Sequence, residues 1–184
     1  MELSCKEDFA RHGISLLEYG NCVACYCTTG CGECVDDGFC NPDFLIQDLN
    51  IPVEVTGYNH KTPIEKPGMR LDWTMNVTKC KVENFVSGYQ NGAADIGYVY
   101  HYANIFAYDK SNGGKKEVIL KDHIRIIRMD GSFISDYQNQ VFEVRYLSQD
   151  VMICIPPDSK YVISPGEMFE EVALLTIANK PGWC

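Results

Sequence analysis

The chain lacks long hydrophobic runs and the common motifs of enzyme active sites. No stretch of its 184 residues approaches the roughly 18 apolar residues of a membrane-spanning helix. No P-loop, GxGxxG fingerprint or HExxH motif occurs, and the four histidines are scattered along the chain. Because no nucleotide cradle, nucleophile frame or acid–base pair can be assigned, we predict a protein that is not an enzyme and has no membrane partner.

Positive charge is also scarce. Lys and Arg number 16 against 25 Asp and Glu, which gives a net charge of −9. An acidic surface repels phosphate backbones, so nucleic acid is not an expected partner. The first residues, "MELSCKEDFARHG", do not show the basic segment and apolar run of a secretory signal. We therefore expect synthesis inside the cell without a signal peptide.

Cysteine, in contrast, is plentiful, and six of the ten cysteines lie between residues 22 and 40. Two Cys-x2-Cys pairs could wrap a tetrahedral zinc ion, and their members are Cys22, Cys25, Cys31 and Cys34. Cys27 and Cys40 are alternative ligands. No Lys or Arg lies within this segment to stabilise thiolates, so its cysteines are expected to be metal-bound or protonated and inert.

Other interpretations of the cysteine-rich segment stay open. An even number of cysteines permits a full set of disulfides, although the missing signal does not favour an oxidising compartment. Unligated thiols in a packed loop are a further alternative. Redox chemistry at a Cys-x-x-Cys pair is disfavoured because acidic residues flank the pairs and no βαβ pattern surrounds them. Zinc is the metal that the spacing favours over an iron–sulfur cluster.

Local patterns predict a β-rich body between two helices. Ser4 and Glu7 fit a capping box for a helix over 5–19, and Ser164 and Glu167 fit one for a helix over 165–178. Residues 21–42 show no periodicity. Strands are expected within 69–78, 80–89, 95–109, 116–130, 140–147 and 151–156, with turns at 111–114 and 130–132.

These elements predict a mainly β, α+β fold. Its core is expected to be an antiparallel β-sandwich or barrel, with an N-terminal helix, a Cys-rich loop and a C-terminal helix attached. We divide the chain into 1–42, the first helix with a possible metal module, 43–164, the β core, and 165–184, the last helix and tail.

Charge and aromatic residues point to contacts with other protein subunits. Residues 110–130 carry a net charge of +3, whereas residues 1–42 carry −5. Such polarity suits head-to-tail docking, although a solvated strand face would give the same pattern. Residues 98–108 contain more tyrosines than one strand face needs, and tyrosine suits interfaces.

In general form the predicted architecture resembles the small β-rich neck, tail (head-to-tail joining) or decoration proteins of tailed bacteriophages. No family motif is matched, so no residue role can be transferred. The resemblance implies a non-enzymatic structural subunit of a homo-oligomeric or viral ring or tail, found in the virion or the host cytoplasm. The alternatives are an intracellular zinc-stabilised protein-binding module and a secreted disulfide-rich domain.

Overall fold

A computed structural model describes residues 1–18, 42–63, 74–108, 116–146 and 150–179. For 58–63, 104–108 and 116–122 only the backbone is described. The helices are α1 (Glu2–Arg11), α2 (Lys79–Gln90), α3 (Gly131–Gln138) and α4 (Pro165–Ala178). The strands are β1 (Leu16–Glu18), β2 (Phe44–Ile46), β3 (Ile51–Pro63), β4 (Met75–Thr78), β5 (Gly97–Tyr108), β6 (Lys116–Met129), β7 (Glu143–Tyr146), β8 (Val151–Ile155) and β9 (Val162–Ile163).

The strands form two open sheets in a mixed α+β fold. The larger sheet has the order β1-β2-β3-β5-β6-β9, and the smaller has the order β4-β8-β7. Among the described strands neither sheet closes on itself, so the barrel alternative of the prediction is wrong. All described pairings are antiparallel except β3 with β5, which is parallel from Val53 opposite Tyr98 to Pro63 opposite Tyr108. The purely antiparallel core of the sequence prediction is therefore also wrong.

The parallel pairing of β3 with β5 is possible because a helix, and not the predicted strand, lies between them in the sequence. Residues 80–89 were expected to be a strand, but they lie within α2. The buried residues Val82, Phe85 and Val86 are three and four positions apart, which is the spacing of one helix face. The segment β4–α2 thus carries the chain from the end of β3 back to the start of β5, as a parallel pair requires.

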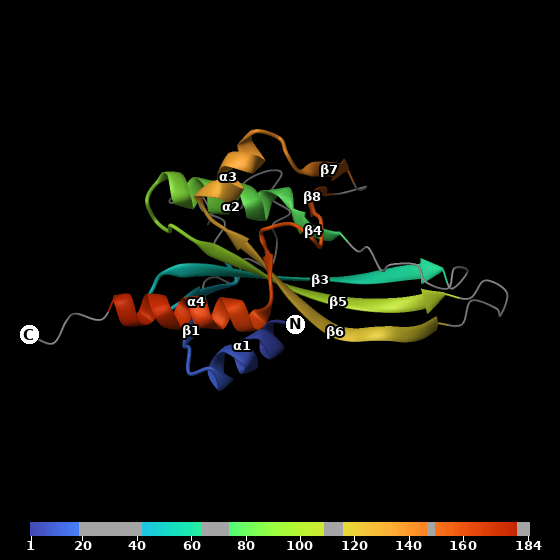
Figure 1. The fold of residues 1–184 in the computed structure, drawn as a ribbon, viewed down its shortest axis with the longest axis horizontal. Helices are drawn as coiled ribbons and strands as arrows, with labels where there is room; N and C mark the ends of the chain where they lie inside the picture. The colour runs from blue at the N-terminus through green and yellow to red at the C-terminus, as the bar shows by residue number, and fades with distance from the viewer. Residues whose placement is uncertain (19–41, 64–73, 109–115, 147–149, 180–184) are drawn as a thin grey trace, which may run out of the picture.

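The larger sheet has a different cover on each face (Figure 1). Helices α1 and α4 lie on one side, and α2, α3 and the smaller sheet lie on the other. The tyrosine-side core, under α1 and α4, contains Cys5, Phe9, Phe44, Ile46, Ile51, Val53, Val55, Ile96, Tyr98, Tyr100, Tyr102, Ile126, Met168, Phe169 and Val172. The aliphatic-side core contains Met75, Val77, Val82, Phe85, Val86, Val99, Ala103, Ile127, Met129, Phe133, Ile134, Phe142, Ile153, Ile155 and Tyr161. Beyond these layers, β3, β5 and β6 continue as a three-stranded ribbon (Figure 1).

The first helix is shorter than predicted. It begins at Glu2 and ends at Arg11, so Ser4, the expected N-cap, lies inside it. His12 is the C-cap, and Gly13 follows with a φ of +71°, a conformation that suits glycine and ends the helix. Residues 16–18 then form β1, because the chain turns back to pair with β2.

Helix starts were predicted with mixed success. The C-terminal helix is confirmed over 165–178, and Ser164 and Glu167 form both hydrogen bonds of the capping box. The turn predicted at 130–132 is wrong. Asp130 instead caps α3 by accepting hydrogen bonds from the backbone N–H groups of Ser132 and Phe133.

The predicted strands 95–109 and 116–130 are confirmed as β5 and β6, and β7 and β8 lie within the remaining two predictions. In β4, Met75 and Val77 are buried as the alternation predicts. The irregular segment 21–42 lies outside the described residues except for Pro42, and so does the turn at 111–114. The three-part division stays a prediction; β1, from its first part, pairs with β2 of its second.

Candidate functional site

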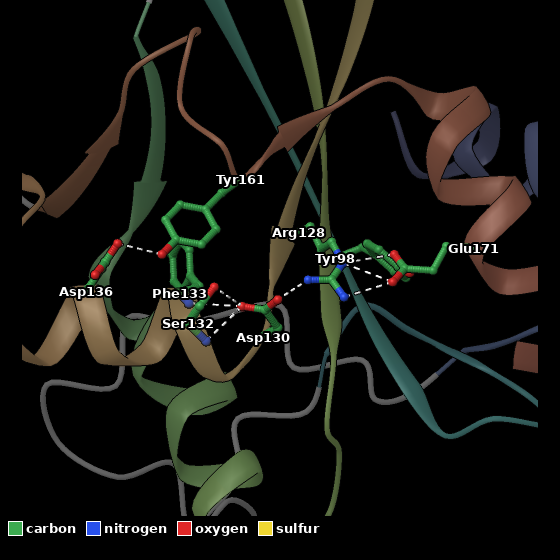
Figure 2. Close-up of polar contacts among 8 residues, drawn as sticks. All are labelled: Tyr98, Arg128, Asp130, Ser132, Phe133, Asp136, Tyr161 and Glu171. Atoms are coloured by element: carbon green, nitrogen blue, oxygen red, sulfur yellow. Dashed lines mark hydrogen bonds and ion pairs between the residues drawn. The ribbon is translucent and has the colours of Figure 1, made fainter.

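A charged network joins both covering layers at the end of β6 (Figure 2). The guanidinium of Arg128 faces the carboxylate of Glu171 on α4, with Nε 3.0 Å from both oxygens and Nη2 2.8 Å from Oε1. Its Nη1 donates to Asp130, the N-cap of α3. Bidentate arginine–carboxylate contacts fix orientation as well as distance. Arg128 therefore sets the position of α4 and of the start of α3 relative to the same strand.

Hydrogen bonds keep both carboxylates of this network ionised. Burial raises the pKa of Glu171, but hydrogen bonds from Arg128 and from the Tyr98 hydroxyl, at 2.8 Å, outweigh it and leave the pKa lowered. Burial likewise opposes ionisation of Asp130, and its bonds from Ser132, Phe133 and Arg128 lower the pKa overall. Hydrogen bonding to Glu171 raises the pKa of Arg128. The network therefore carries fixed charges at neutral pH and acts as a structural clamp.

A second contact ties α3 to the segment before β9. The Tyr161 hydroxyl donates to Asp136 at 2.6 Å, and Lys160 lies 3.2 Å from the same carboxylate oxygen (Figure 2 shows the tyrosine contact). The hydrogen bonds from Tyr161 and Lys160 lower the pKa of Asp136. The ring of Tyr161 also packs edge-on against Phe133, with the ring centroids 5.1 Å apart. This contact extends the clamp from the end of β6 along α3.

A buried ion cluster lies between β3 and α2, and we call its members, Asp43, Glu54 and Lys81, the Lys81 cluster. The Lys81 ammonium is 2.6 Å from Glu54 Oε2, 3.0 Å from Asp43 Oδ2 and 3.2 Å from the carbonyl of Val55. Asp43 Oδ2 also accepts a hydrogen bond from the backbone N–H of Val55 at 2.7 Å. Only 6% of Glu54 is exposed. Two carboxylates therefore share one cation in a site largely closed to solvent.

Burial gives Glu54 a proton affinity unlike that of a surface glutamate. Desolvation and, to a lesser extent, the nearby Asp43 carboxylate raise the pKa of Glu54 to about 7 against the attraction of Lys81. The pKa of Lys81 is itself raised, because the two carboxylates outweigh the effect of burial. The cluster can bind or release one proton near neutral pH, whereas the Arg128 network cannot.

The predicted zinc ligands Cys22, Cys25, Cys31 and Cys34 and the alternates Cys27 and Cys40 lie outside the described residues. Within the described part of the chain, no three His, Cys, Asp or Glu side chains form a group that could hold a metal ion. Cys5, Cys80 and Cys154 are free thiols. Burial raises the pKa of the Cys5 thiol to about 12, so it is inert as a nucleophile.

Sequence reasoning missed both charged clusters. Glu54 stands between two valines of one strand, and such alternation normally places the charged side chain on a solvated face. Its cation lies 27 positions away on a helix that was expected to be a strand. Arg128 was grouped with a solvated positive face, and its partner on α4 is 43 positions away.

Several large apolar side chains are exposed to solvent. On α4, Leu174 and Ile177 are 67% and 66% exposed, and no charged residue lies between Val172 and Asn179. On β7, Val144 and Tyr146 are 41% and 82% exposed. A helical segment that is apolar on every side, as the last part of α4 is, is normally buried. We take these two places, among the described residues, as candidate docking surfaces.

A pocket of about 470 Å³ lies between α1 and β1, where Lys6 forms an ion pair with Glu18. Neither Glu54 nor Arg128 lines it. The described helices do not include one that is both long and apolar enough to cross a membrane. In comparisons with known proteins, the chain matches no protein-family model, no curated protein and no solved structure.

Proposed function

We propose that the chain is a non-enzymatic structural subunit of a larger homo-oligomeric or viral assembly, such as a ring, neck, tail or decoration component. The observation that carries the proposal is the exposed apolar half of α4. The outer face of this helix is acidic at Glu167 and Glu170 and becomes apolar at Leu174 and Ile177. Side chains of this kind gain free energy when a neighbouring protein surface removes them from water.

The clamp at Arg128 supports this proposal because it presents α4 in one orientation. Glu171 is held by two donor groups of Arg128 and by the Tyr98 hydroxyl. It lies about one helical turn before Leu174 and nearly two turns before Ile177. Met168 and Val172 are completely buried against the sheet on the opposite face of the helix. A docking surface that is fixed before binding costs less conformational entropy when the partner arrives.

The arrangement of the sheets supports the finer architecture. Residues of both sheets contribute to the aliphatic-side core, among them Val99 and Ile127 of the larger sheet and Ile153 and Ile155 of the smaller one. We propose that this half of the molecule is a two-sheet sandwich. The three-stranded ribbon beyond the layers (Figure 1) adds backbone surface at which a neighbouring subunit could pack. We also propose that the cysteine-rich segment binds zinc. The proposed location of the protein is the virion or the host cytoplasm.

Native mass spectrometry and sedimentation velocity of the full chain test the proposal. We expect a species of several times 20.8 kDa at high concentration, and a loss of mass when Leu174→Glu and Ile177→Glu are combined. Gln138→Glu on α3 is a control that adds charge at an exposed helix position. A monomer at every concentration would contradict the proposal. Elemental analysis of the same sample tests for zinc.

A further inference from the structure

The outer edge of β7 is an uncovered strand edge. β7 pairs with β8 on one side, and no other described strand adjoins it on the opposite side. All of its residues, Glu143 to Tyr146, are exposed. An edge strand presents a row of backbone N–H and C=O groups that another strand can bind. The edge therefore offers main-chain hydrogen bonds to a partner, and its side chains indicate which partner fits.

The side chains of β7 form a pattern that is complementary to itself. Val144 is flanked by Glu143 and Arg145, whose charged groups lie on the opposite face and form an ion pair with N–O distances of 2.8 and 3.1 Å. In an antiparallel pair centred on Val144, each Glu143 faces Arg145 of the second copy, and each Arg145 faces Glu143. Opposite charges placed in this way stabilise a strand pair.

Other registers do not have this complementarity. Centring the pair on Glu143 places the two glutamates opposite each other, and centring it on Arg145 places the two arginines opposite each other. Like charges directly opposite destabilise a strand pair. A pair centred between two residues places Glu143 opposite Val144. The charged face of one copy would then continue the apolar face of the other. One register is therefore favoured over its neighbours.

We propose that β7 binds β7 of a second copy of this chain, antiparallel and about a two-fold axis at Val144. The inference rests on the proposed function and names one of its contacts. The two three-stranded sheets become one six-stranded sheet, and Tyr146 of each copy lies opposite Phe142 of the other. Tyr146 is the most exposed large side chain among those described as exposed and apolar, and this contact covers it.

The size of the contact sets its strength. Four residues per copy bury far less than the roughly 1,600 Å² of a standard interface. We therefore expect reversible dimers that form at micromolar or higher concentrations. A two-fold contact closes on itself, so growth beyond a dimer uses a second surface, and α4 offers one.

Charge substitution in trans tests the contact. Glu143→Lys leaves two positive residues facing two positive residues, and Arg145→Glu leaves two negative residues facing two negative residues. We expect each variant alone to raise the dimer dissociation constant about tenfold or more. Mixed one to one, the variants pair opposite charges at both positions, so dimers should return. Pairing within one chain cannot produce this recovery.

The controls carry the same charge changes at other exposed sites. Glu83→Lys on α2 and Lys160→Glu before β9 should leave the dissociation constant unchanged, as measured by sedimentation velocity. A wild-type oligomer that neither β7 variant weakens would overturn the β7 contact and leave the proposed assembly standing. A wild-type monomer at all concentrations would overturn both.

Cross-linking tests the register without altering charge. Val144→Cys places two thiols opposite each other, where antiparallel strands bring Cα atoms to about 4.5–5.5 Å, within the range of a disulfide. Val141→Cys is the displaced control, because its two copies would lie about 20 Å apart. We expect peptide mapping after mild oxidation to find the link between copies at position 144 and none at position 141. A link at 141 alone, or none at 144, would overturn the register.

Discussion

The two faces of β5 are built from different residues and are covered in different ways. Tyr98, Tyr100 and Tyr102 point toward α1 and α4, whereas Val99 and Ala103 point toward α2 and the smaller sheet. On the tyrosine side, hydroxyl groups reach the rim of the core, where Tyr98 donates to Glu171 and Tyr100 donates to Asp8. On the aliphatic side, described polar contacts across the layers gather at the Lys81 cluster and at Tyr161.

The difference separates stabilisation from orientation. An aliphatic side chain stabilises by leaving water and has no preferred direction. A tyrosine adds a directional hydrogen bond at the tip of an apolar ring, so it can fix where a covering helix lies. Phe9 and Phe169 bring α1 and α4 together on this side, with ring centroids 5.1 Å apart. We infer that the tyrosine side positions the candidate docking surface of α4, through the hydrogen bond from Tyr98 to Glu171.

The strongest test of the comparison uses two neighbouring residues of β6. Ile126 and Ile127 are both fully buried, and they face the tyrosine-side core and the aliphatic-side core respectively. We expect Ile126→Ala and Ile127→Ala each to lower the free energy of unfolding by about 2–5 kcal/mol. Urea unfolding followed by circular dichroism should show one transition for both variants. Two separate transitions would mean that the two faces unfold independently.

The next test concerns the cation of the aliphatic side. Lys81→Met leaves Asp43 and Glu54 without their partner and should lower the free energy of unfolding by roughly 3 kcal/mol at pH 8. The loss should be smaller at pH 6, because Glu54, with a pKa of about 7, then takes up a proton. Chemical denaturation across this pH range measures the difference. An equal loss at both pH values would contradict the buried pair.

Glu54 itself should contribute to the pH dependence of the free energy of unfolding of the wild-type protein. Its pKa in the folded protein, about 7, lies above the ordinary value of 4.5 that the unfolded chain retains. Between these values the folded state holds more protons than the unfolded state, so the contribution of Glu54 to stability falls as the pH rises toward and through 7. Glu54→Gln should flatten this slope relative to wild type between pH 5 and pH 8. If the slope is unchanged in Glu54→Gln, the pH dependence of stability in this range comes from another titrating group.

A smaller effect is expected on the tyrosine side, at the clamp. Glu171→Gln removes the charge that Arg128 binds and should lower the free energy of unfolding by about 2 kcal/mol. Glu170→Gln, its exposed neighbour, is the matched control and should change it by less than about 0.5 kcal/mol. In Glu171→Gln, amide hydrogen exchange should become faster in α4 than in the wild-type protein, with a smaller change in α2. Equal effects of the two substitutions would contradict the clamp.

The smallest effects compare the caps of the covering helices. Ser164→Ala removes the capping box of α4 and should cost about 1 kcal/mol. Asp130→Ala removes the cap of α3 together with a contact to Arg128, so its cost should be larger, up to about 2 kcal/mol. Thermal unfolding of both variants ranks them. The reverse order would mean that Asp130 acts as an ordinary cap.

Prediction from the sequence succeeded where the signal was local. The C-terminal helix was predicted with its bounds because Ser164, Pro165 and Glu167 specify a helix start without help from the fold. Helix α2 was missed because its valines and aromatic residues favour strands, and packing of their helical stripe outweighs that preference. The two charged clusters depend on partners far apart in sequence, so no local pattern could reveal them.

The parallel pairing of β3 and β5 has a consequence for the order in which the chain folds. β5 and β6 are consecutive and antiparallel, so they can pair as soon as both have been synthesised. β3 leaves the ribosome earlier, but its partner β5 comes only after β4 and α2. Until β5 has been synthesised, β3 can pair only with β2, on the other side of the strand. The β4–α2 crossover is thus the step on which the pairing of β3 with β5 waits, and substitutions there should slow refolding more than equally buried changes in β6.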